Sequence, residues 1–531
     1  MPVLTAVDLV RIQQYVFSSN RLRDVLAASY VVEQALDSQG GLRPNQGSVI
    51  LAGGGNALLR FDSLDLARKW TRDFTRRLQE LAPGIEAAIA HQTFEPGGLA
   101  QAWWLLHADL ARRKLDRRPS IPQAGLTVTA TCTVTGLPAT AVNEEGQPVS
   151  NRVQVLGSAI QDSTQRWAGF LPKELEHAPG WSAAFPVELD QLGRTPGETS
   201  LIGVVHVDGN EVGELIREWL RKRLDAPDTH VVREAQEWAS ALSRLADRVL
   251  ERLVERIVRC IHLRRRATTG AQEIRVEGQP KELSFPLRYS KNSHQVFLPL
   301  RPIVLGGDDM TFIADGRIAL DLGVAALREF EEGQVPHLVP EGGPGGLTAC
   351  AGVALVRSHA PFYRAYQAAK MLCSSAKAAR RSAGDGGGWL DWAVGMVRPM
   401  HSVEEWREAY RSMQWTLTMR PYAVTAAGRW NWDWLDLEVL GPGPQSQRAQ
   451  GLRGDPAWRL SRNRVKQLEA LAREGPQAVR KQLSVWRATQ PGLKLPGDLG
   501  HDGFFGADTP LVDAIEVMDL HLRLEAEEAR R

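Results

Sequence analysis

The chain has 531 residues, of which 43 % are hydrophobic, and its formal charge is +2 at pH 7. This length predicts three or four domains, and the near-neutral charge excludes a strongly basic surface as the general means of binding nucleic acid. Four cysteines without metal-like spacing, and no apolar run of membrane-spanning length, exclude a disulfide framework and predict a cytoplasmic protein.

Residues 1–120 have the pattern of an α+β unit built around a hairpin. Its elements are expected, in chain order, as strand 3–10, helix 21–36, strands 48–52 and 57–61, helix 64–81 and strand 85–93. The two middle strands are joined by Gly53-Gly54-Gly55-Asn56, a glycine-rich sequence typical of hairpin turns.

Residues 121–195 are predicted to form a connector, because proline, glycine and polar residues interrupt them repeatedly. Within it, residues 132–139 have the outline of a zinc knuckle but contain only Cys132. Structural zinc needs four ligands, so this degenerate knuckle is not expected to bind metal.

The same order of elements returns at larger scale in residues 196–396. The expected elements are strand 200–207, a long amphipathic helix ending near 261, two strands on either side of the GGDD sequence at 306–309, helix 320–332, strand 347–356 and helix 361–381. Two units of similar order, each with a glycine hairpin, predict an internal duplication. Residues 397–531 are predicted to form a helical domain rich in tryptophan.

Two acids at the tip of the second hairpin carry the chemistry. Buried carboxylates are costly unless they are paired, hydrogen-bonded or bound to metal, and Asp308 and Asp309 follow the glycines Gly306 and Gly307. Asp208 ends an apolar strand that could lie beside this hairpin. Three carboxylates on adjoining strand ends would form an oxygen-rich site for hard divalent cations. The alternative is that GGDD is only a turn sequence, since Gly and Asp favour hairpin turns.

The ordered motifs resemble the large polymerase-cyclase subunit of type III CRISPR complexes, which is related to diguanylate cyclases. The likeness covers residues 3–395 and rests on Asp8 to Phe17 with Arg21 to Asp24 and Ala28-Ser29, Gly53 to Asn56, Asp208-Gly209-Asn210-Glu211-Val212-Gly213, Gly306 to Asp309, and Ala351 to Ala354 with Pro361-Phe362 and the helix to Lys377. The implied fold class is α+β: two ferredoxin-like palm domains, a connector and a C-terminal helical domain.

The resemblance also implies an active site and a reaction. Asp208, Asp308 and Asp309 would bind two Mg²⁺ or Mn²⁺ ions, and the carbonyl group of Gly209 would contribute a further ligand. The nucleotide-binding residues would be Gly306, Gly307, Lys377, Gly209 and Asn210; for Lys377 the alternative is a solvated helix lysine. The family joins ATP by 3′–5′ bonds with release of pyrophosphate, giving cyclic oligoadenylates for antiviral defence.

The sequence departs from that family at several positions. Asn210 replaces the second aspartate of the Asp-Gly-Asp element, and Asn56 stands where a ligand would be in the first palm, so a single catalytic palm is expected. The family's amino-terminal HD nuclease domain is expected to be missing. The His501-Asp502 pair lacks the further histidine and aspartate of such a metal site and is interpreted as part of a loop.

The remaining candidates have ordinary structural explanations. The arginines at 264–266 and 380–381 could contact RNA or phosphates, but basic residues at helix ends usually interact with the helix dipole. The tail tryptophans could stack on bases, although core aromatics are commoner. His206 is expected to be a satisfied core histidine.

Three functions therefore remain open at the level of the sequence. The first is the cyclase. The second is a non-catalytic assembly subunit that binds guide RNA and other CRISPR subunits, and the third is a stand-alone cyclase with another cyclic product. Expected partners are nucleotides, CRISPR subunits and guide or target RNA, or a second copy of the chain, with no membrane.

Overall fold

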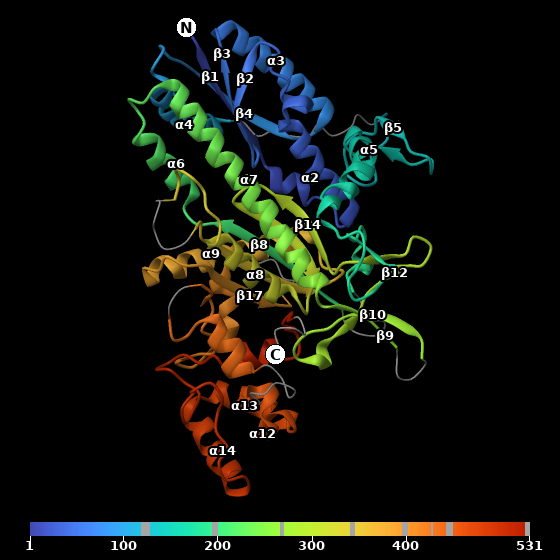
Figure 1. Ribbon diagram of the computed structural model, residues 1–531, viewed down its shortest axis with the longest axis vertical. Coiled ribbons are helices and arrows are strands. Elements are labelled where there is room, and N and C mark those ends of the chain that lie inside the picture. The colour runs from blue at the N-terminus through green and yellow to red at the C-terminus, as the bar shows by residue number, and fades with distance from the viewer. Residues whose placement is uncertain are drawn as a thin grey trace.

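The computed structural model describes residues 1–117, 128–193, 200–265, 270–339, 346–395, 402–425, 428–441 and 450–525. In these ranges the chain is an α+β protein that runs from a first unit, through a larger second unit, to a group of helices (Figure 1). The expected domain boundaries near 120, 195 and 396 all lie outside the described residues, so the division into domains stays a prediction.

The first unit contains a four-stranded antiparallel sheet in the order β2-β3-β1-β4. Its elements are β1 (Val3–Val10), α1 (Ile12–Val16), α2 (Leu22–Leu36), β2 (Gly47–Gly53), β3 (Asn56–Phe61), α3 (Leu64–Leu81), β4 (Glu86–Thr93) and α4 (Leu99–Asp116). Successive side chains of a strand point to opposite faces. Val3 and Val7 of β1 accordingly pack with α2 and α3, whereas Leu4 and Ala6 pack with α4.

The second unit repeats this strand order inside a six-stranded sheet, β14-β15-β8-β16-β17-β20. Its main elements are β8 (Leu201–Gly209), α6 (Val212–Arg221), α7 (Asp228–Val258), β14 (Leu300–Leu305), β15 (Asp309–Asp315), α8 (Ala319–Glu331), β16 (Ala349–Arg357), α9 (Phe362–Ala383) and β17 (Trp389–Val394). The order β14-β15-β8-β16 matches β2-β3-β1-β4 strand for strand, which is the antiparallel order of a βαββαβ unit. The predicted duplication is therefore confirmed at the level of topology.

Helices cover both faces of the second sheet. Val204 packs with residues of α9, and its neighbour Val205 packs with residues of α8. Helix α9 begins after Pro361 and ends at Gly384, whose φ of 65° is the left-handed conformation that glycine adopts without strain at a helix end. The face of α9 that lies on β8 and β16 is the one that brings lysines to the end of β8.

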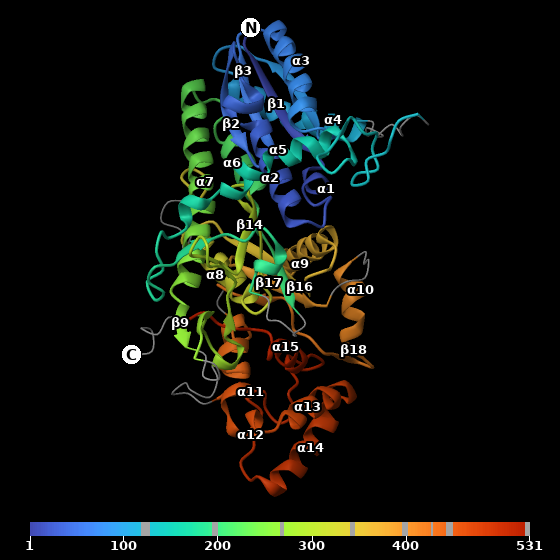
Figure 2. The ribbon, with the colours of Figure 1, turned by 90° about the vertical axis from the view of Figure 1, so that its right-hand side faces the viewer.

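The long helix α7 joins the two units into one body. It contacts α4 and β2 of the first unit and α8 and β14 of the second. Both views show it running lengthwise beside the two sheets (Figures 1 and 2). The amphipathic pattern predicted this helix, although it ends at Val258 rather than near 261.

Several elements differ from the sequence prediction. Helix α4 was not predicted, because its Trp104 and Leu105 stay exposed and blur the apolar stripe. The connector contains α5 (Asn151–Gln165), a mostly polar helix that packs on α2. Strand β20 (Tyr422–Ala423), in the predicted C-terminal domain, pairs with β17 of the second sheet. A strand of two residues has no periodicity to read, so only the folded chain reveals it.

Short strands complete the connector and the second unit. They are β5 (Ala141–Val142), β6 (Pro148–Val149), β7 (Ser182–Ala184), β9 (Ile261–Arg265), β10 (Gln272–Val276), β11 (Phe285–Pro286), β12 (Tyr289–Ser290) and β13 (Gln295–Phe297). β7 of the connector pairs with β13, so the connector is tied to the second unit by backbone hydrogen bonds.

The tail is mainly helical, as predicted. Its elements are α10 (Val403–Arg407), β18 (Arg411–Ser412), β19 (Trp415–Thr416), β20, α11 (Gly451–Gly454), α12 (Pro456–Arg459), α13 (Arg462–Glu474), α14 (Pro476–Thr489) and α15 (Leu511–Val517). Trp432, Trp434 and Trp458 are buried in its core, which favours the structural explanation of these tryptophans. Among the helices of the described ranges, none combines the length and hydropathy of a transmembrane segment.

Candidate active site

The GGDD sequence forms the tip of the hairpin between β14 and β15. The N–H group of Gly306 donates to the carbonyl oxygen of Asp309 at 2.8 Å, which closes the turn. Gly307 has a φ of 82°, so the turn needs a residue that adopts the left-handed region easily. GGDD therefore forms a tight turn, and that turn carries two acids.

Strand β8 brings Asp208 to the same tip. Asp208 is directly opposite Asp309 in the antiparallel pairing of β8 with β15. Directly opposed residues of antiparallel strands point to the same face of the sheet. Asp208 and Asp309 therefore share the face that α9 covers, as the sequence predicted for strand ends that adjoin.

Gly209 allows the tip to approach the end of β8 closely. Its N–H group donates to the carbonyl oxygen of Asp308 at 2.8 Å. A Cβ atom on Gly209 would lie 2.9 Å from the Cβ atom of Asp308, a distance too short for two carbon atoms that are not bonded. A glycine at this position therefore keeps Asp308 next to Asp208.

Helix α9 supplies the positive charge of the site. The ammonium group of Lys377 lies 2.7 Å from Oδ2 of Asp208 and donates to the carbonyl oxygen of Gly209 at 2.7 Å. Lys370, two turns earlier, donates to Oε1 of Gln13 in the first unit at 2.8 Å. Sequence reasoning named Lys377 and missed Lys370, which the seven-residue helical spacing from Lys377 could have indicated.

The surroundings of Asp308 and Asp309 disfavour the charged form of their carboxyl groups. Burial, together with the charges of Asp208 and Asp309, raises the pKa of Asp308 to about 6. Burial and the charge of Asp208 raise the pKa of Asp309 to about 7, although Lys370 and Lys377 act in the opposite direction. Burial is the larger cause for both groups, and the neighbouring carboxylates add to it.

One carboxylate oxygen has no partner of its own. Oδ1 of Asp309 is buried and accepts no hydrogen bond from any of the described residues. Nδ1 of His206 lies 3.3 Å away, but that nitrogen is 3.1 Å from Oγ1 of Thr311. Burial lowers the pKa of His206 to about 4, so the ring is neutral and adds no charge. An orphaned buried oxygen beside two more carboxylates fits a bound cation.

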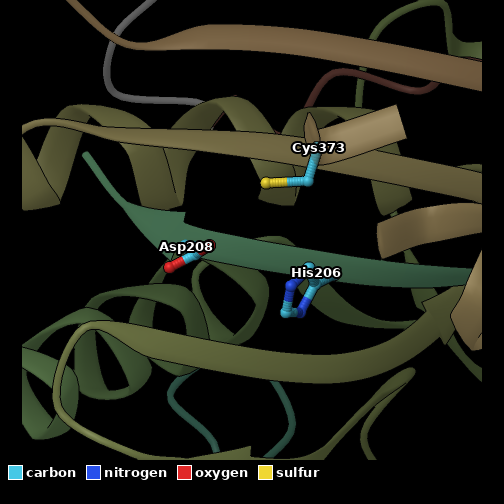
Figure 3. A group of neighbouring side chains, drawn as sticks. All are labelled: His206, Asp208 and Cys373. Carbon is cyan, nitrogen blue, oxygen red and sulfur yellow. The ribbon is translucent and has the colours of Figure 1, made fainter. Parts of the chain in front are cut away.

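A second group of metal-binding residue types shares Asp208. Ligand atoms of His206, Asp208 and Cys373 lie within 4.8 Å of one another, with two residues from β8 and one from α9 (Figure 3). The thiol of Cys373 donates to the carbonyl oxygen of Cys350 at 3.2 Å, and burial raises its pKa. Metals bind the thiolate, and His206 already contacts Thr311, so both residues would have to change protonation or partner to bind a metal here.

Asn210 is turned away from the acids. Its backbone N–H donates to the carbonyl oxygen of Thr348 at 2.8 Å, and its side-chain amide donates to Oγ1 of the same residue at 3.0 Å. The side chain is buried. Asn210 therefore holds the end of β8 against the segment that enters β16.

The glycine hairpins of the two units meet at their tips. A Cβ atom on Gly54 would lie 3.3 Å from the carbonyl oxygen of Gly306. Together with the hydrogen bond from Lys370 to Gln13, this contact places the candidate site at the junction of the two units. The first unit thus borders the site although it lacks the acidic pair.

The duplication can be followed residue by residue around this junction. Asp8 of β1 is opposite Asn56 of β3, in the register that puts Asp208 opposite Asp309. Asp8 also forms an ion pair with Lys114 of α4, as Asp208 does with Lys377 of α9. Asp8 and Lys114 are equivalents that sequence reasoning did not identify, because the pairing depends on the register of distant strands.

The basic clusters of the sequence are engaged within the fold. Arg380 lies 3.2 Å and Arg381 lies 3.8 Å from the carboxylate of Glu211. Arg264 forms two hydrogen bonds with the carboxylate of Glu277, and Arg266 lies outside the described residues. These contacts favour structural roles for the clusters over phosphate binding.

The protein resembles known proteins in its structure but not detectably in its sequence. No protein-family model matches the sequence, and no curated protein matches it. A chain in the crystal structure of a Csm1–Csm4 cassette with one ATP aligns with a TM-score of 0.52 and 13 % identity, covering 98 % of this chain and 70 % of that one. A chain of the Csm1–Csm4 cassette in complex with cA3 aligns with a TM-score of 0.51 and 15 % identity. The alignment covers 98 % of this chain and 69 % of that one.

The Csm1–Csm4 subcomplex of the type III-A CRISPR-Csm interference complex also aligns, with a TM-score of 0.50, 14 % identity, and coverage of 98 % and 70 %. The protein therefore has the fold of a chain from the Csm1–Csm4 structures. It spans 63 % of the length of the matched chain in the cassette with cA4. At 13–15 % identity this likeness shows the fold alone.

Because burial raises the pKa of Asp309, its negative charge is expected to lower the stability of the folded protein when no metal is bound. In the metal-free protein, replacing Asp309 with asparagine should raise the thermal midpoint by about 2–4 °C at pH 8, from a gain of about 1–2 kcal/mol after allowance for its partial exposure. A raised pKa means that the folded state loses stability as pH rises toward about 7. The gain should therefore shrink as the pH falls toward 4.

The measurement is thermal unfolding with EDTA at pH 8 and pH 5, repeated at pH 8 with Mn²⁺. The wild type should gain more stability from Mn²⁺ than the variant does, because only the wild type keeps all three carboxylates. If Asp309→Asn is less stable than the wild type in EDTA at pH 8, the charge of Asp309 does not destabilise the folded protein.

Proposed function

We propose that this chain is a metal-dependent nucleotidyltransferase and cyclase, which converts ATP to a cyclic oligoadenylate with release of pyrophosphate in CRISPR-type antiviral defence. The observation that carries this proposal is the cluster of Asp208, Asp308 and Asp309 at adjoining strand ends, with an orphaned oxygen and Lys377 beside it. Its fold is shared with chains crystallised with ATP and with cA3, which supports adenine nucleotides as ligands.

The residues of this site suit two bound ions of Mg²⁺ or Mn²⁺. Asp208, Asp308 and Asp309 would hold them together with the carbonyl oxygen of Gly209, since hard cations prefer oxygen ligands. Such ions supply neutralisation of the charge that develops on the attacking and leaving oxygens of phosphoryl transfer. The side chains and backbone of the site would bind and orient the nucleotide and keep water away from it.

Nucleotide binding is assigned to residues around the same tip. Gly306 and Gly307 carry no side chains, so a substrate can approach their backbone. Lys377 is placed on α9 with an ammonium group that can contact a triphosphate. Asn210 is assigned to positioning Gly209, because its amide is already bonded to Thr348.

The two units are proposed to be two palm domains, of which only the second is catalytic. The strand order of both units and the matching register of Asp8 and Asp208 support the duplication. Gly55 and Asn56 occupy the positions of Asp308 and Asp309 in the first unit. That unit therefore keeps one carboxylate of the three and contributes a wall of the site.

A second candidate function is that of an assembly subunit. It is favoured by the likeness to a chain from the Csm1–Csm4 subcomplex of an interference complex. In that case the partners would be other CRISPR subunits and guide or target RNA. The cyclase and the assembly functions can coexist in one chain, whereas a purely structural subunit has no need for a buried, unpartnered carboxylate oxygen.

Product analysis tests the proposal directly. The purified chain, alone and with co-purified partners, is incubated with each of the four nucleoside triphosphates and Mg²⁺ or Mn²⁺. We expect pyrophosphate and a cyclic adenylate from ATP, identified by mass spectrometry. Detection of a cyclic product from another nucleotide would point to a stand-alone cyclase of different specificity. Co-purified RNA and subunits without any nucleotide product would favour the assembly function.

A further inference from the structure

The ammonium group of Lys377 lies where a metal ion would be expected. Its two contacts, Oδ2 of Asp208 and the carbonyl oxygen of Gly209, are both 2.7 Å long. These are two of the oxygens assigned above to metal binding. The Lys377 side chain is largely buried, so this contact is an internal one rather than a surface ion pair.

We propose that Lys377 is a resident cation that fills the metal seat between Asp208 and Gly209, and that it has to leave before metal binds. An ammonium group and a divalent cation repel each other and are drawn to the same oxygens. Binding of metal and the Lys377 contact therefore exclude each other. The inference rests on the proposed function, because it takes these carboxylates to be metal ligands.

The release of Lys377 would couple metal binding to binding of the nucleotide triphosphate. Its flexible four-carbon stem lets the ammonium group move away from Asp208 while it remains anchored on α9. Once free, the group is available to the triphosphate of a nucleotide. The metal-free site then lacks both a metal and a phosphate-binding lysine, so a nucleotide without metal should bind poorly.

The first unit has an equivalent ion pair at a position that lacks two of the three acids. Asp8 and Lys114 form the equivalent ion pair, but Gly55 and Asn56 replace the other two acids. One lysine there balances one carboxylate. In the second unit Lys377 contacts one of three carboxylates, so negative charge remains around it and favours its replacement by a divalent ion.

Lys370 provides a control that separates occupation of this position from charge alone. It lies two turns before Lys377 on α9, and its ammonium group donates to Oε1 of Gln13 instead of contacting Asp208. Removing Lys370 takes away one nearby positive charge without emptying the seat. Removing Lys377 takes away the same charge and empties the seat.

Binding of Mn²⁺ in the absence of nucleotide tests the proposal. Free Mn²⁺ is followed by electron paramagnetic resonance in the wild type and in Lys377→Met, Lys370→Met and Lys114→Met. Lys377→Met should bind Mn²⁺ about tenfold more tightly than the wild type. Lys370→Met should gain clearly less, and Lys114→Met should leave the affinity unchanged. Lys377→Gln is the second variant if Lys377→Met does not fold.

A second titration uses a non-hydrolysable ATP analogue at saturating Mn²⁺. Here Lys377→Met should bind the analogue about tenfold more weakly than the wild type, because the released lysine is missing. Unchanged or weaker Mn²⁺ affinity in Lys377→Met, or in Lys377→Gln where Lys377→Met does not fold, would overturn the resident-cation proposal and leave the proposed function intact. A wild type that binds no Mn²⁺ would overturn the proposed function and this inference together.

Discussion

Replacing Asp208, Asp308 or Asp309 singly with asparagine is expected to lower the rate of cyclic product formation by about a thousandfold. Metal ions at such a site contribute several kcal/mol of charge stabilisation, and every 1.4 kcal/mol is about tenfold in rate. Asparagine keeps the size of the side chain and removes the charge. The measurement is the rate of pyrophosphate release from ATP, with product identity checked by mass spectrometry.

The duplication supplies a matched control for this series. Asp8→Asn removes the same charge at the equivalent register position of the first unit, together with its ion pair to Lys114. It should leave the rate within a few-fold of the wild type, since exposed or partly exposed ion pairs contribute little. Equal rates in the wild type and in Asp308→Asn and Asp309→Asn would show that the GGDD turn is only a turn.

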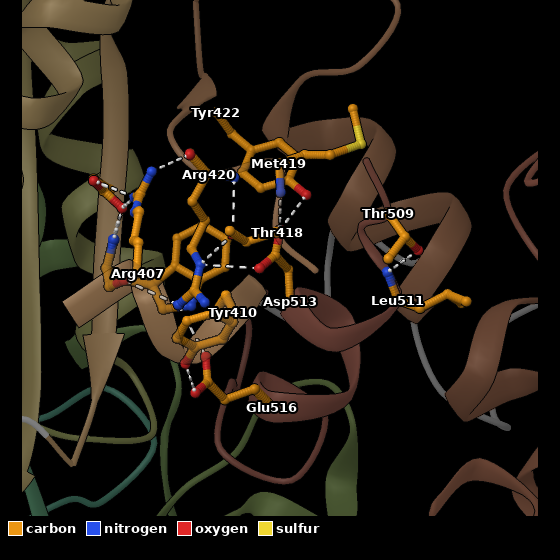
Figure 4. A network of polar contacts seen from close by, with 12 residues as sticks. Arg407, Tyr410, Thr418, Met419, Arg420, Tyr422, Thr509, Leu511, Asp513 and Glu516 are labelled. Carbon is orange, nitrogen blue, oxygen red and sulfur yellow. Dashed lines mark hydrogen bonds and ion pairs between the residues drawn. The ribbon is translucent and has the colours of Figure 1, made fainter. Parts of the chain in front are cut away.

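The largest effect on stability is expected at Arg420, where the C-terminal helices meet the second sheet. Nε of Arg420 lies 2.9 Å from Oδ1 of Asp513, and Nη1 lies 2.9 Å from Oε2 of Glu516, both on α15 (Figure 4). The side chains of Arg420 and Asp513 are fully buried. Nη1 also donates to the carbonyl oxygen of Trp392 in β17 at 3.0 Å.

Arg420→Met should lower the free energy of unfolding of this part of the chain by about 3–5 kcal/mol, because the buried Asp513 loses its cation and keeps only its hydrogen bonds from Met419 and Tyr422. Arg429→Met is the matched control, since Arg429 pairs with Asp498 at 3.7 Å on the surface. It should cost less than about 0.5 kcal/mol. Urea unfolding followed by tryptophan fluorescence measures both, because the buried Trp392 and the half-buried Trp406 lie against the Arg420 guanidinium group.

This network also predicts a separation of stability from metal binding. Arg420→Met should leave Mn²⁺ affinity unchanged under conditions where the variant is folded, because the Asp208 seat is formed by β8 and α9. Equal unfolding curves for Arg420→Met and Arg429→Met would contradict the role of Arg420 in joining α15 to the sheet.

Local patterns were enough to predict much of the architecture. Helix α3 was predicted with the bounds Leu64–Leu81, and in the structure its buried residues lie on one face and Ser63 caps its start. The two glycine hairpins were predicted from their turns, since Gly and Asp favour the conformations that tight turns need. The order of elements in turn predicted the duplication that the two sheets confirm.

What the sequence by itself determined, then, is most of the helices and strands of the two units and the acids at one hairpin tip, but not α4, α5 or β20. The tertiary structure decided which groups meet: Asp208 with Asp309, the two glycine tips, and Lys377 with Gly209, whose positions are 168 residues apart in the chain. The physical reason is that helices and turns depend on neighbouring residues, whereas strand register and charge pairing depend on how distant segments pack. The Lys377 contact, on which the further inference depends, exists only in the folded protein.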